Sequence, residues 1–198
     1  MTDQTIPTET PEAHPVTKVL RDWFLVVVLA LGAALLVRVY VLQQFYISGP
    51  SMESTMFQDN RVLVNKLSYR LHDIHRGDVV VFDRVTTDGV AVQHDDLIKR
   101  VIGLAGDTIS ISKCVVSVNG KAIDEPYLND YDLSQSNLDD RCRIPEMVAT
   151  KVADGQLFVM GDNRPQSFDS RMFGTIDESL VIGRAFVIIW PIGSFHWL

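Results

Sequence analysis

One run of apolar residues dominates the hydrophobic pattern of the chain. Between residues 23 and 42, 18 of 20 positions are apolar, and the exceptions are Gly32 and Arg38. Twenty helical residues span about 30 Å, which matches the hydrocarbon core of a bilayer. Arg38 lies one turn from the end of the run, where its long side chain reaches the headgroups. The pattern predicts a transmembrane anchor over residues 23–42.

Two other interpretations of this run are a cleaved signal peptide and a buried core helix. A signal peptide begins near the N-terminus with a basic region and has a shorter apolar core. Here 22 residues precede the run, and three acidic residues come before the first base, Lys18. We therefore expect an uncleaved single-span anchor, preceded by a disordered tail over residues 1–22. Orientation is weakly encoded, since Lys18 and Arg21 are opposed only by Arg38.

From residue 43 onward the pattern changes to short β-branched runs separated by glycines. These runs predict strands at residues 61–67, 78–82, 97–102, 157–160 and 180–189.

The clearest local signal lies at residues 115–123, where Asn119-Gly120 separates VVSV from KAI. Asn-Gly accepts the positive φ angles of a type I′ turn, so this stretch predicts a hairpin. Residues 124–150 are acidic and poor in aliphatics, which suits an exposed excursion between core strands. We expect residues 43–198 to form one mainly β, antiparallel domain with few helices.

Composition and charge exclude several classes of protein. The 198 residues carry a net charge of −7, which argues against a basic face that grips nucleic acid. The mean hydropathy of +0.11 is high for a soluble chain. Without the apolar run, about 41% of the remaining residues are hydrophobic, an ordinary soluble value. A disordered chain, a collagen-like fibre and a multi-span membrane protein are excluded.

Cys114 and Cys142 are the only cysteines, and neither lies in a CxxC pair. In a domain outside the cytoplasm they can form a disulfide. The closed loop of about 29 residues would then contribute roughly 3.5 kcal/mol of stability. The alternative is two free thiols. His72 and His75 have no acidic or thiol partner at a ligand spacing, so no metal site and no cofactor are expected.

Three segments carry candidate chemistry. Ser51 follows Gly49-Pro50, a pair that forces a tight backbone path and can present a hydroxyl to a cleft. Alone, this is also an ordinary turn.

Lys99 shares a strand face with Leu97 and Val101, and burial there would lower its pKa so that a neutral amine could take a proton from a serine. The alternative is a snorkelling lysine on an edge strand.

The third segment, residues 161–171, alternates arginines and aspartates with hydroxyl residues after a predicted strand. Such a loop can cross-link itself through charge-assisted hydrogen bonds and fix a neighbouring side chain. By itself it is equally consistent with a well-bonded surface loop.

Together these segments resemble the bacterial type I signal peptidases, membrane-anchored Ser/Lys proteases. Four blocks match in order: GPSMESTM, RGDVVVFDR, IKRVIGLAGD and MGDNRPQSFDSRMFG. The match covers most of residues 45–190. It implies an antiparallel β-sheet catalytic domain of the signal-peptidase/LexA-like type with a small inserted cap region, a reduced second domain at about residues 108–155.

The resemblance also implies roles for individual residues. Ser51 is expected to be the nucleophile and Lys99 the general base, with Ser167 orienting the lysine amine. The oxyanion hole is expected to use the Ser51 backbone N–H and a main-chain donor at Gly49. The remaining matched residues would form a supporting structural network: Arg100, Asp162, Asn163, Arg164, Asp169 and Arg171.

Two positions depart from the family pattern. Ser54 stands where the family often has proline, and Ala105 replaces the proline of a GLPGD turn. Both changes relax a backbone constraint and remove no reactive group.

The implied function is a membrane-bound serine endopeptidase that removes N-terminal signal peptides from exported pre-proteins by a Ser/Lys dyad. Its catalytic domain would lie on the extracytoplasmic side of the plasma membrane. The lipid bilayer and the secretion translocon are expected partners, and nucleic acid is not. Whether the enzyme is general or dedicated, for example to pilus assembly, stays open.

Other interpretations start from the same residues. A Ser-His-Asp hydrolase would use His94, which has Asp95 and Asp96 beside it, but adjacent strand side chains point apart. A LexA-like autoprotease shares the Ser/Lys chemistry, yet this chain has a predicted membrane span and no N-terminal DNA-binding helical segment. A membrane-anchored binding module or a pseudoenzyme is the alternative outside the enzymes.

Overall fold

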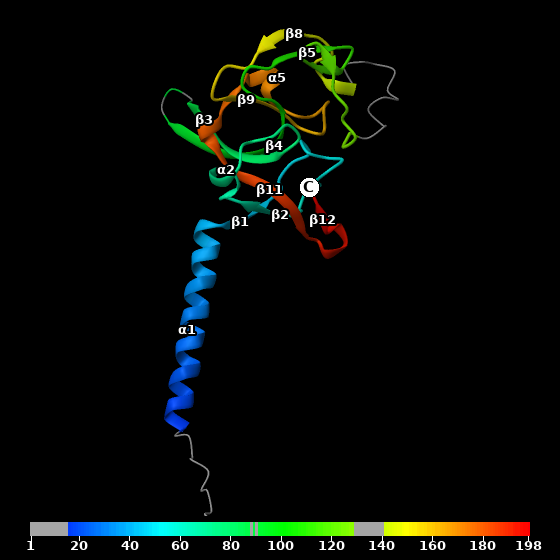
Figure 1. Ribbon diagram of the computed structural model, residues 1–198. Helices are drawn as coiled ribbons and strands as arrows, with labels where there is room; N and C mark the ends of the chain where they lie inside the picture. The colour runs from blue at the N-terminus through cyan, green and yellow to red at the C-terminus, as the bar shows by residue number, and fades with distance from the viewer. Residues whose placement is uncertain (1–15, 88, 90, 129–140) are drawn as a thin grey trace, which may run out of the picture. The chain divides into compact units, whose positions relative to one another are not determined.

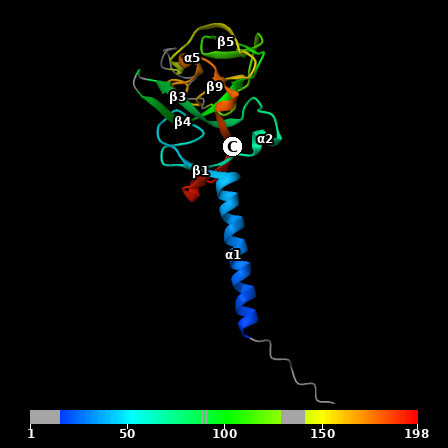
Figure 2. The same cartoon turned by 90° about the vertical axis from the view of Figure 1, so that its left-hand side faces the viewer.

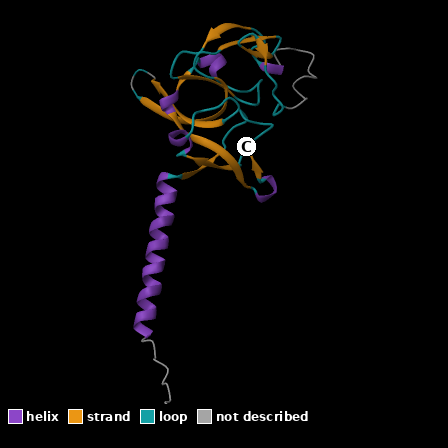
Figure 3. Ribbon diagram, in the orientation of Figure 1, coloured by secondary structure: helices purple, strands orange, loops and turns teal. Residues whose placement is uncertain are grey.

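The computed structural model describes residues 16–87, 89, 91–128 and 141–198 (Figure 1). The chain divides into two units, Met1–Val39 and Tyr40–Leu198. The first contains nearly all of a long helix, and the second contains every described strand. Figure 3 shows that strands dominate the second unit and that its helices are short.

Helix α1 spans Val16–Tyr40 and is long and apolar enough to cross a membrane. It begins seven residues before the start of the expected anchor and ends two residues before the end of that anchor. The polar residues Lys18, Arg21 and Asp22 therefore belong to its first turns and not to a tail. No glycine or proline occurs between Val16 and Leu31, so nothing in the sequence stops the helix from starting early. The rest of the expected tail, residues 1–15, lies outside the described residues.

The larger sheet of the second unit is antiparallel and has eight strands in the order β1-β2-β11-β3-β4-β9-β10, with β12 added to β11. Its strands are β1 (Leu42–Tyr46), β2 (Arg61–Asn65), β3 (Val79–Thr87), β4 (Val92–Gly103), β9 (Gln156–Met160), β10 (Ile176–Asp177), β11 (Val181–Trp190) and β12 (His196–Trp197). Short helices α2 (Ser68–Leu71) and α5 (Ser170–Phe173) follow β2 and β9 in the chain.

A second sheet of four strands has the order β7-β6-β5-β8. Its strands are β5 (Thr108–Ser112), β6 (Val115–Val118), β7 (Lys121–Ala122) and β8 (Met147–Lys151). The predicted hairpin is confirmed: β6 pairs with β7, and the turn residues Asn119 and Gly120 have φ angles of 53° and 77°. In both views this sheet lies at the opposite end of the unit from β1 (Figures 1 and 2).

The two sheets share a core, because Ile109, Val116 and Val118 of the small sheet pack with Ile102, Phe158 and Met160 of the large one. Two further clusters of valines, isoleucines and leucines lie on either face of β3. The fold is thus mainly antiparallel β, as expected. Residues 108–155 contribute the small sheet, and the chain does not separate there into a further unit.

A disulfide joins Cys114 and Cys142, one of the two states that the sequence left open. It connects the turn between β5 and β6 to the chain just before β8. The bond therefore ties the two ends of the segment that includes residues 129–140, which lie outside the described residues.

Strands β1 and β4 each leave part of one edge unpaired, and the two unpaired edges lie beside each other. β4 pairs with β3 along most of its length but with β9 only from Arg100 to Gly103. β1 pairs with β2 alone among the described strands. Residues Asp96–Lys99 and Phe45–Gly49 border one common cavity. The fold therefore presents two strand edges to the same space.

Candidate active site

Ser51 and Lys99 meet in the structure, although 48 residues separate them in the chain. The Lys99 Nζ donates a 2.8 Å hydrogen bond to the Ser51 Oγ and a second, also 2.8 Å, to the Ile98 carbonyl. Lys99 lies on β4 and is only 2% exposed, while Ser51 lies in the turn after β1. An amine and a hydroxyl at this distance can exchange a proton.

Burial lowers the pKa of Lys99 from 10.5 to about 8. Val80 lies opposite Lys99 across the β3–β4 ladder, and Leu97 and Val101 belong to the same apolar cluster as Val80. Such surroundings disfavour the charged amine, while the charges of nearby aspartates raise the pKa and partly oppose the effect. At pH 7 about one tenth of the amine is neutral, compared with about three parts in ten thousand for an ordinary lysine.

The turn that carries Ser51 is held by its own backbone and by two buried methionines. Gly49 adopts a φ of +119°, a conformation that favours glycine. The Met56 N–H donates to the Met52 carbonyl at 2.8 Å, and both methionine side chains are fully buried in the core. Packing of these two side chains in the core thus fixes the turn, and Ser51 remains at the border of the cavity.

The cavity beside the dyad is small, with a volume of about 70 Å³. The β1 edge and the β4 edge form its walls, and Val81 lies among its lining residues. Gly49 and Ser51 border the same space, and in the described part of the chain neither of their backbone N–H groups has a hydrogen-bond acceptor. These two donors therefore have no protein partner in the described part of the chain.

The block that contains Gly161, Asp162 and Asn163, called the GDN block below, also holds the turn at Ser51. The Asn163 N–H donates to the Ser51 carbonyl at 3.1 Å, and the Asn163 side chain donates to Glu53 at 3.3 Å. Gly161 packs so closely that a Cβ there would overlap the Ser51 carbonyl and the Ser167 side chain. Only a glycine fits at this contact.

Two buried ion pairs lie behind the dyad. Arg100 binds Asp162 through two hydrogen bonds of 2.9 and 2.6 Å, and Arg171 binds Asp169 through two of 2.8 and 2.7 Å. Asp169 also accepts a 3.0 Å hydrogen bond from the Gly161 N–H. Burial alone would raise the pKa of Asp169, but the hydrogen bonds and charge of Arg171 hold it below its ordinary value. Asp169 therefore stays charged near Lys99.

Ser167 is fully buried, and its backbone N–H donates to the Asn163 carbonyl at 2.9 Å. The hydrogen bonds of the Lys99 amine go to Ser51 and Ile98. Ser167 was expected to contact this amine, but in the described chain it is not a hydrogen-bond partner of Lys99.

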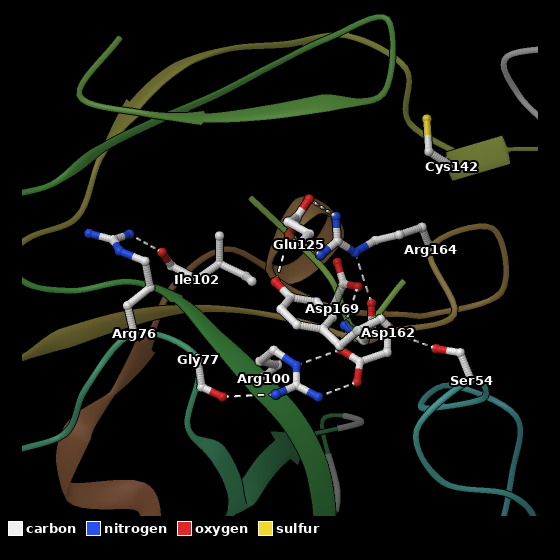
Figure 4. Close-up of polar contacts among 12 residues, drawn as sticks. Ser54, Arg76, Gly77, Arg100, Ile102, Glu125, Cys142, Asp162, Arg164 and Asp169 are labelled. Carbon is white, nitrogen blue, oxygen red and sulfur yellow. Dashed lines mark hydrogen bonds and ion pairs between the residues drawn. The ribbon is translucent and has the colours of Figure 1, made fainter. Parts of the chain in front are cut away.

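Sequence reasoning missed several residues that complete this network. The Thr55 hydroxyl donates to Asp162 at 2.6 Å, and the Arg164 guanidinium forms a buried two-point ion pair with Glu125 (Figure 4). The ring of Tyr127 lies 4.0 Å from the Arg100 guanidinium carbon. Glu125 and Tyr127 belong to the acidic stretch that was expected to be an exposed excursion, so its composition concealed them.

His94 does not approach the serine. Its Nδ1 lies 2.6 Å from an Asp83 carboxylate oxygen on the β3–β4 hairpin, and the side chain is largely exposed. Among the described residues, no group of three or more histidine, cysteine or acidic side chains is placed to hold a metal ion.

Comparisons with known proteins identify the family of this chain. The family model described as "Signal peptidase, peptidase S26" matches residues 20–190. The chain belongs to the signal peptidase family. A probable signal peptidase I-2 from Synechocystis is 39% identical over 84% of this chain and 69% of its own length.

Further relatives and one solved structure extend the comparison. Signal peptidase I of Bacillus caldolyticus is 39% identical over 80% of this chain and 85% of the relative, and signal peptidase IB of Staphylococcus aureus is 33% identical over 91% and 94%. The structural match to a solved signal peptidase I from Enterococcus faecalis covers 57% of this chain and 97% of the solved chain, with 28% identity and a TM-score of 0.42.

Replacing Gly161 with alanine should destabilise this signal peptidase, because the added methyl group has no room between Ser51 and Ser167. Overpacking of this kind costs roughly 1–3 kcal/mol. Gly193→Ala is the matched control, since no atom lies within 4 Å of a Cβ at that position. Thermal unfolding of the full chain in detergent, followed by tryptophan fluorescence, measures both. Equal melting temperatures for the two variants would contradict the close contact.

Proposed function

We propose that Ser51 is the nucleophile and Lys99 the general base of this signal peptidase. The observation that carries the proposal is the 2.8 Å contact between a buried lysine amine and the serine hydroxyl. The protein functions as a signal peptidase I, a serine endopeptidase that cleaves signal peptides from pre-proteins. The residue roles below explain how this chain performs that cleavage.

In the first step the neutral Lys99 amine accepts the proton of the Ser51 hydroxyl as the oxygen attacks the scissile carbonyl. The carbonyl oxygen becomes an oxyanion, and the Ser51 and Gly49 N–H groups are the donors that stabilise it. Such donors contribute typically about 3 kcal/mol each to the transition state. The protonated Lys99 then donates its proton to the leaving amine, and the acyl-enzyme forms.

The second step hydrolyses the acyl-enzyme. The leaving amine has departed with the mature protein, and Lys99 is again neutral. It accepts a proton from water, which attacks the ester carbonyl, and the same two N–H donors stabilise the second oxyanion. The intermediate then collapses: the bond between the carbonyl carbon and Ser51 Oγ breaks, Lys99 returns the proton to Ser51, and the signal peptide leaves with a free carboxylate. Asp169 and Asp162 limit how far the pKa of Lys99 falls, so that the amine is basic enough to accept the proton.

The two open strand edges support binding of the substrate as an extended strand. A peptide placed between Phe45–Gly49 and Asp96–Lys99 can form main-chain hydrogen bonds with both, which gives affinity without a requirement for particular side chains. The cavity of about 70 Å³ accommodates only a small side chain beside the dyad. This agrees with the small residues that the family resemblance implies before the cut.

The proposal extends to the setting of the enzyme. Helix α1 would be a single membrane span, with the catalytic unit on the extracytoplasmic side of the plasma membrane. Only one residue separates the end of α1 from β1, and Ser51 lies nine residues after Leu42, the first residue of β1. The secretion translocon would supply the pre-protein substrates at this membrane.

Ser51→Ala and Lys99→Ala should each lower the rate of pre-protein cleavage by at least about 10³-fold, because each removes one half of the proton-transfer pair. His94→Ala is the control. Because His94 pairs with Asp83 and not with Ser51, this variant should cleave the pre-protein at the wild-type rate. Purified full-length variants are incubated with a pre-protein, and the products are followed by gel and mass spectrometry. Substantial cleavage by either dyad variant would reject the assignment.

The pH dependence follows from the pKa of Lys99. The amine must be neutral to accept the serine proton, so kcat/KM should fall about tenfold per pH unit below pH 8 and level off above it. Initial rates of pre-protein cleavage from pH 5.5 to 10 measure this limb. An inflection near 6.5 would point to a histidine base, and a rate still rising tenfold per pH unit at pH 10 to a lysine that burial does not affect.

A further inference from the structure

The nucleophile turn makes a contact that neither the family pattern nor the dyad explains. Ser54, three residues after Ser51, has a φ of +91°, a conformation that side chains rarely adopt. A proline, which the family often has here, fixes φ near −65° and does not fit this backbone. The turn of this chain is therefore held in a different way. The Ser54 hydroxyl donates a 2.9 Å hydrogen bond to the Tyr127 carbonyl (Figure 4).

Tyr127 contacts the ion pair behind the dyad with its ring as well. The Arg100 guanidinium lies 4.0 Å from the centre of the ring, in the geometry of a cation–π interaction. Arg100 is the residue after Lys99 on β4, and it holds Asp162 through two hydrogen bonds. Thr55 of the nucleophile turn donates to the same carboxylate. The ring thus covers the point where the turn and β4 are joined.

The position of Tyr127 is itself fixed. Its hydroxyl donates to Glu125 at 2.7 Å, and Glu125 forms the buried ion pair with Arg164 of the GDN block. Burial, followed by the charge of Glu125, raises the pKa of Tyr127, so the hydroxyl keeps its proton as a donor. The segment that contains Glu125 and Tyr127 therefore contacts the nucleophile turn, strand β4 and the GDN block.

A cavity of about 570 Å³ borders this contact and is lined by Ser54, Thr55, Arg100 and Tyr127 together with the C-terminal strands. Without the ring, more of the Arg100 guanidinium would be open to water in this cavity. Water competes for its hydrogen bonds and weakens the ion pair with Asp162. The nucleophile turn would then lose its link to β4, while the substrate edges of β1 and β4 would remain.

We propose that Tyr127 is a positioning residue for the Ser51–Lys99 dyad, acting through Arg100 with its ring and through Ser54 with its carbonyl. This inference rests on the proposed function. A displacement of reacting groups by about 1 Å can cost 10²-fold in rate without affecting substrate binding. The signature of the role is therefore a loss of kcat with an unchanged KM.

The test compares four variants of the full-length protein in pre-protein cleavage. Tyr127→Leu keeps the apolar bulk without a π face and should lower kcat about 10- to 100-fold, with KM within about twofold of wild type. Tyr127→Phe keeps the ring and should restore kcat to within about threefold. Ser54→Ala removes only the hydroxyl and should lower kcat about 3- to 10-fold. Leu128→Ala, beside Tyr127 in the same cavity, is the control and should resemble wild type.

Three results would overturn the inference: wild-type kcat in Tyr127→Leu, a raised KM with kcat unchanged, or a loss in Tyr127→Phe equal to that in Tyr127→Leu. Melting temperatures identify variants that do not fold. If Tyr127→Leu is unfolded, Ser54→Ala decides, and a wild-type kcat there overturns the inference. Ser51→Ala in the same assay separates the two claims, because its activity tests the nucleophile and is independent of Tyr127.

Discussion

The burial of one lysine amine against one serine hydroxyl is the constraint on which the rest of this structure depends. A charged amine resists transfer into an apolar site, so Lys99 keeps a neutral fraction that an exposed lysine lacks. The site must then exclude water, hold the amine at 2.8 Å from the Ser51 Oγ, and still allow an extended peptide to approach. Strand β4 meets these demands, since its residues from Lys99 to Gly103 are buried while part of its edge stays unpaired.

Keeping Lys99 buried requires charges elsewhere to be balanced. Asp169 and Asp162 lie close enough to raise the pKa of the amine, and each is itself neutralised by a two-point contact with an arginine. Buried pairs of this kind add little net stability, but removing one partner leaves an unpaired charge at high cost. The pairs therefore act less as a source of stability than as a rigid frame that joins β4, the turn at Ser51 and the GDN block.

Much of the architecture was accessible from the sequence, because β-branched runs and an Asn-Gly turn have a direct local cause. β1 was missed since Leu42 continues the apolar run of the helix, and the helix starts early because nothing after residue 15 stops it. The meeting of Ser51 with Lys99 came from resemblance; no local pattern brings together residues 48 positions apart. Glu125 and Tyr127 escaped notice because their partners, Arg164 and Arg100, are set by the tertiary fold.

The central claim is that burial makes Lys99 a base, and the direct test is the pKa of this one amine. NMR titration of the full-length protein with isotope-labelled lysine reports it, and the Lys99→Arg variant identifies the signal by its absence. The account predicts a midpoint near pH 8. A midpoint near 10.5, the value of an ordinary lysine, would contradict it, because the amine would then stay charged wherever the enzyme works.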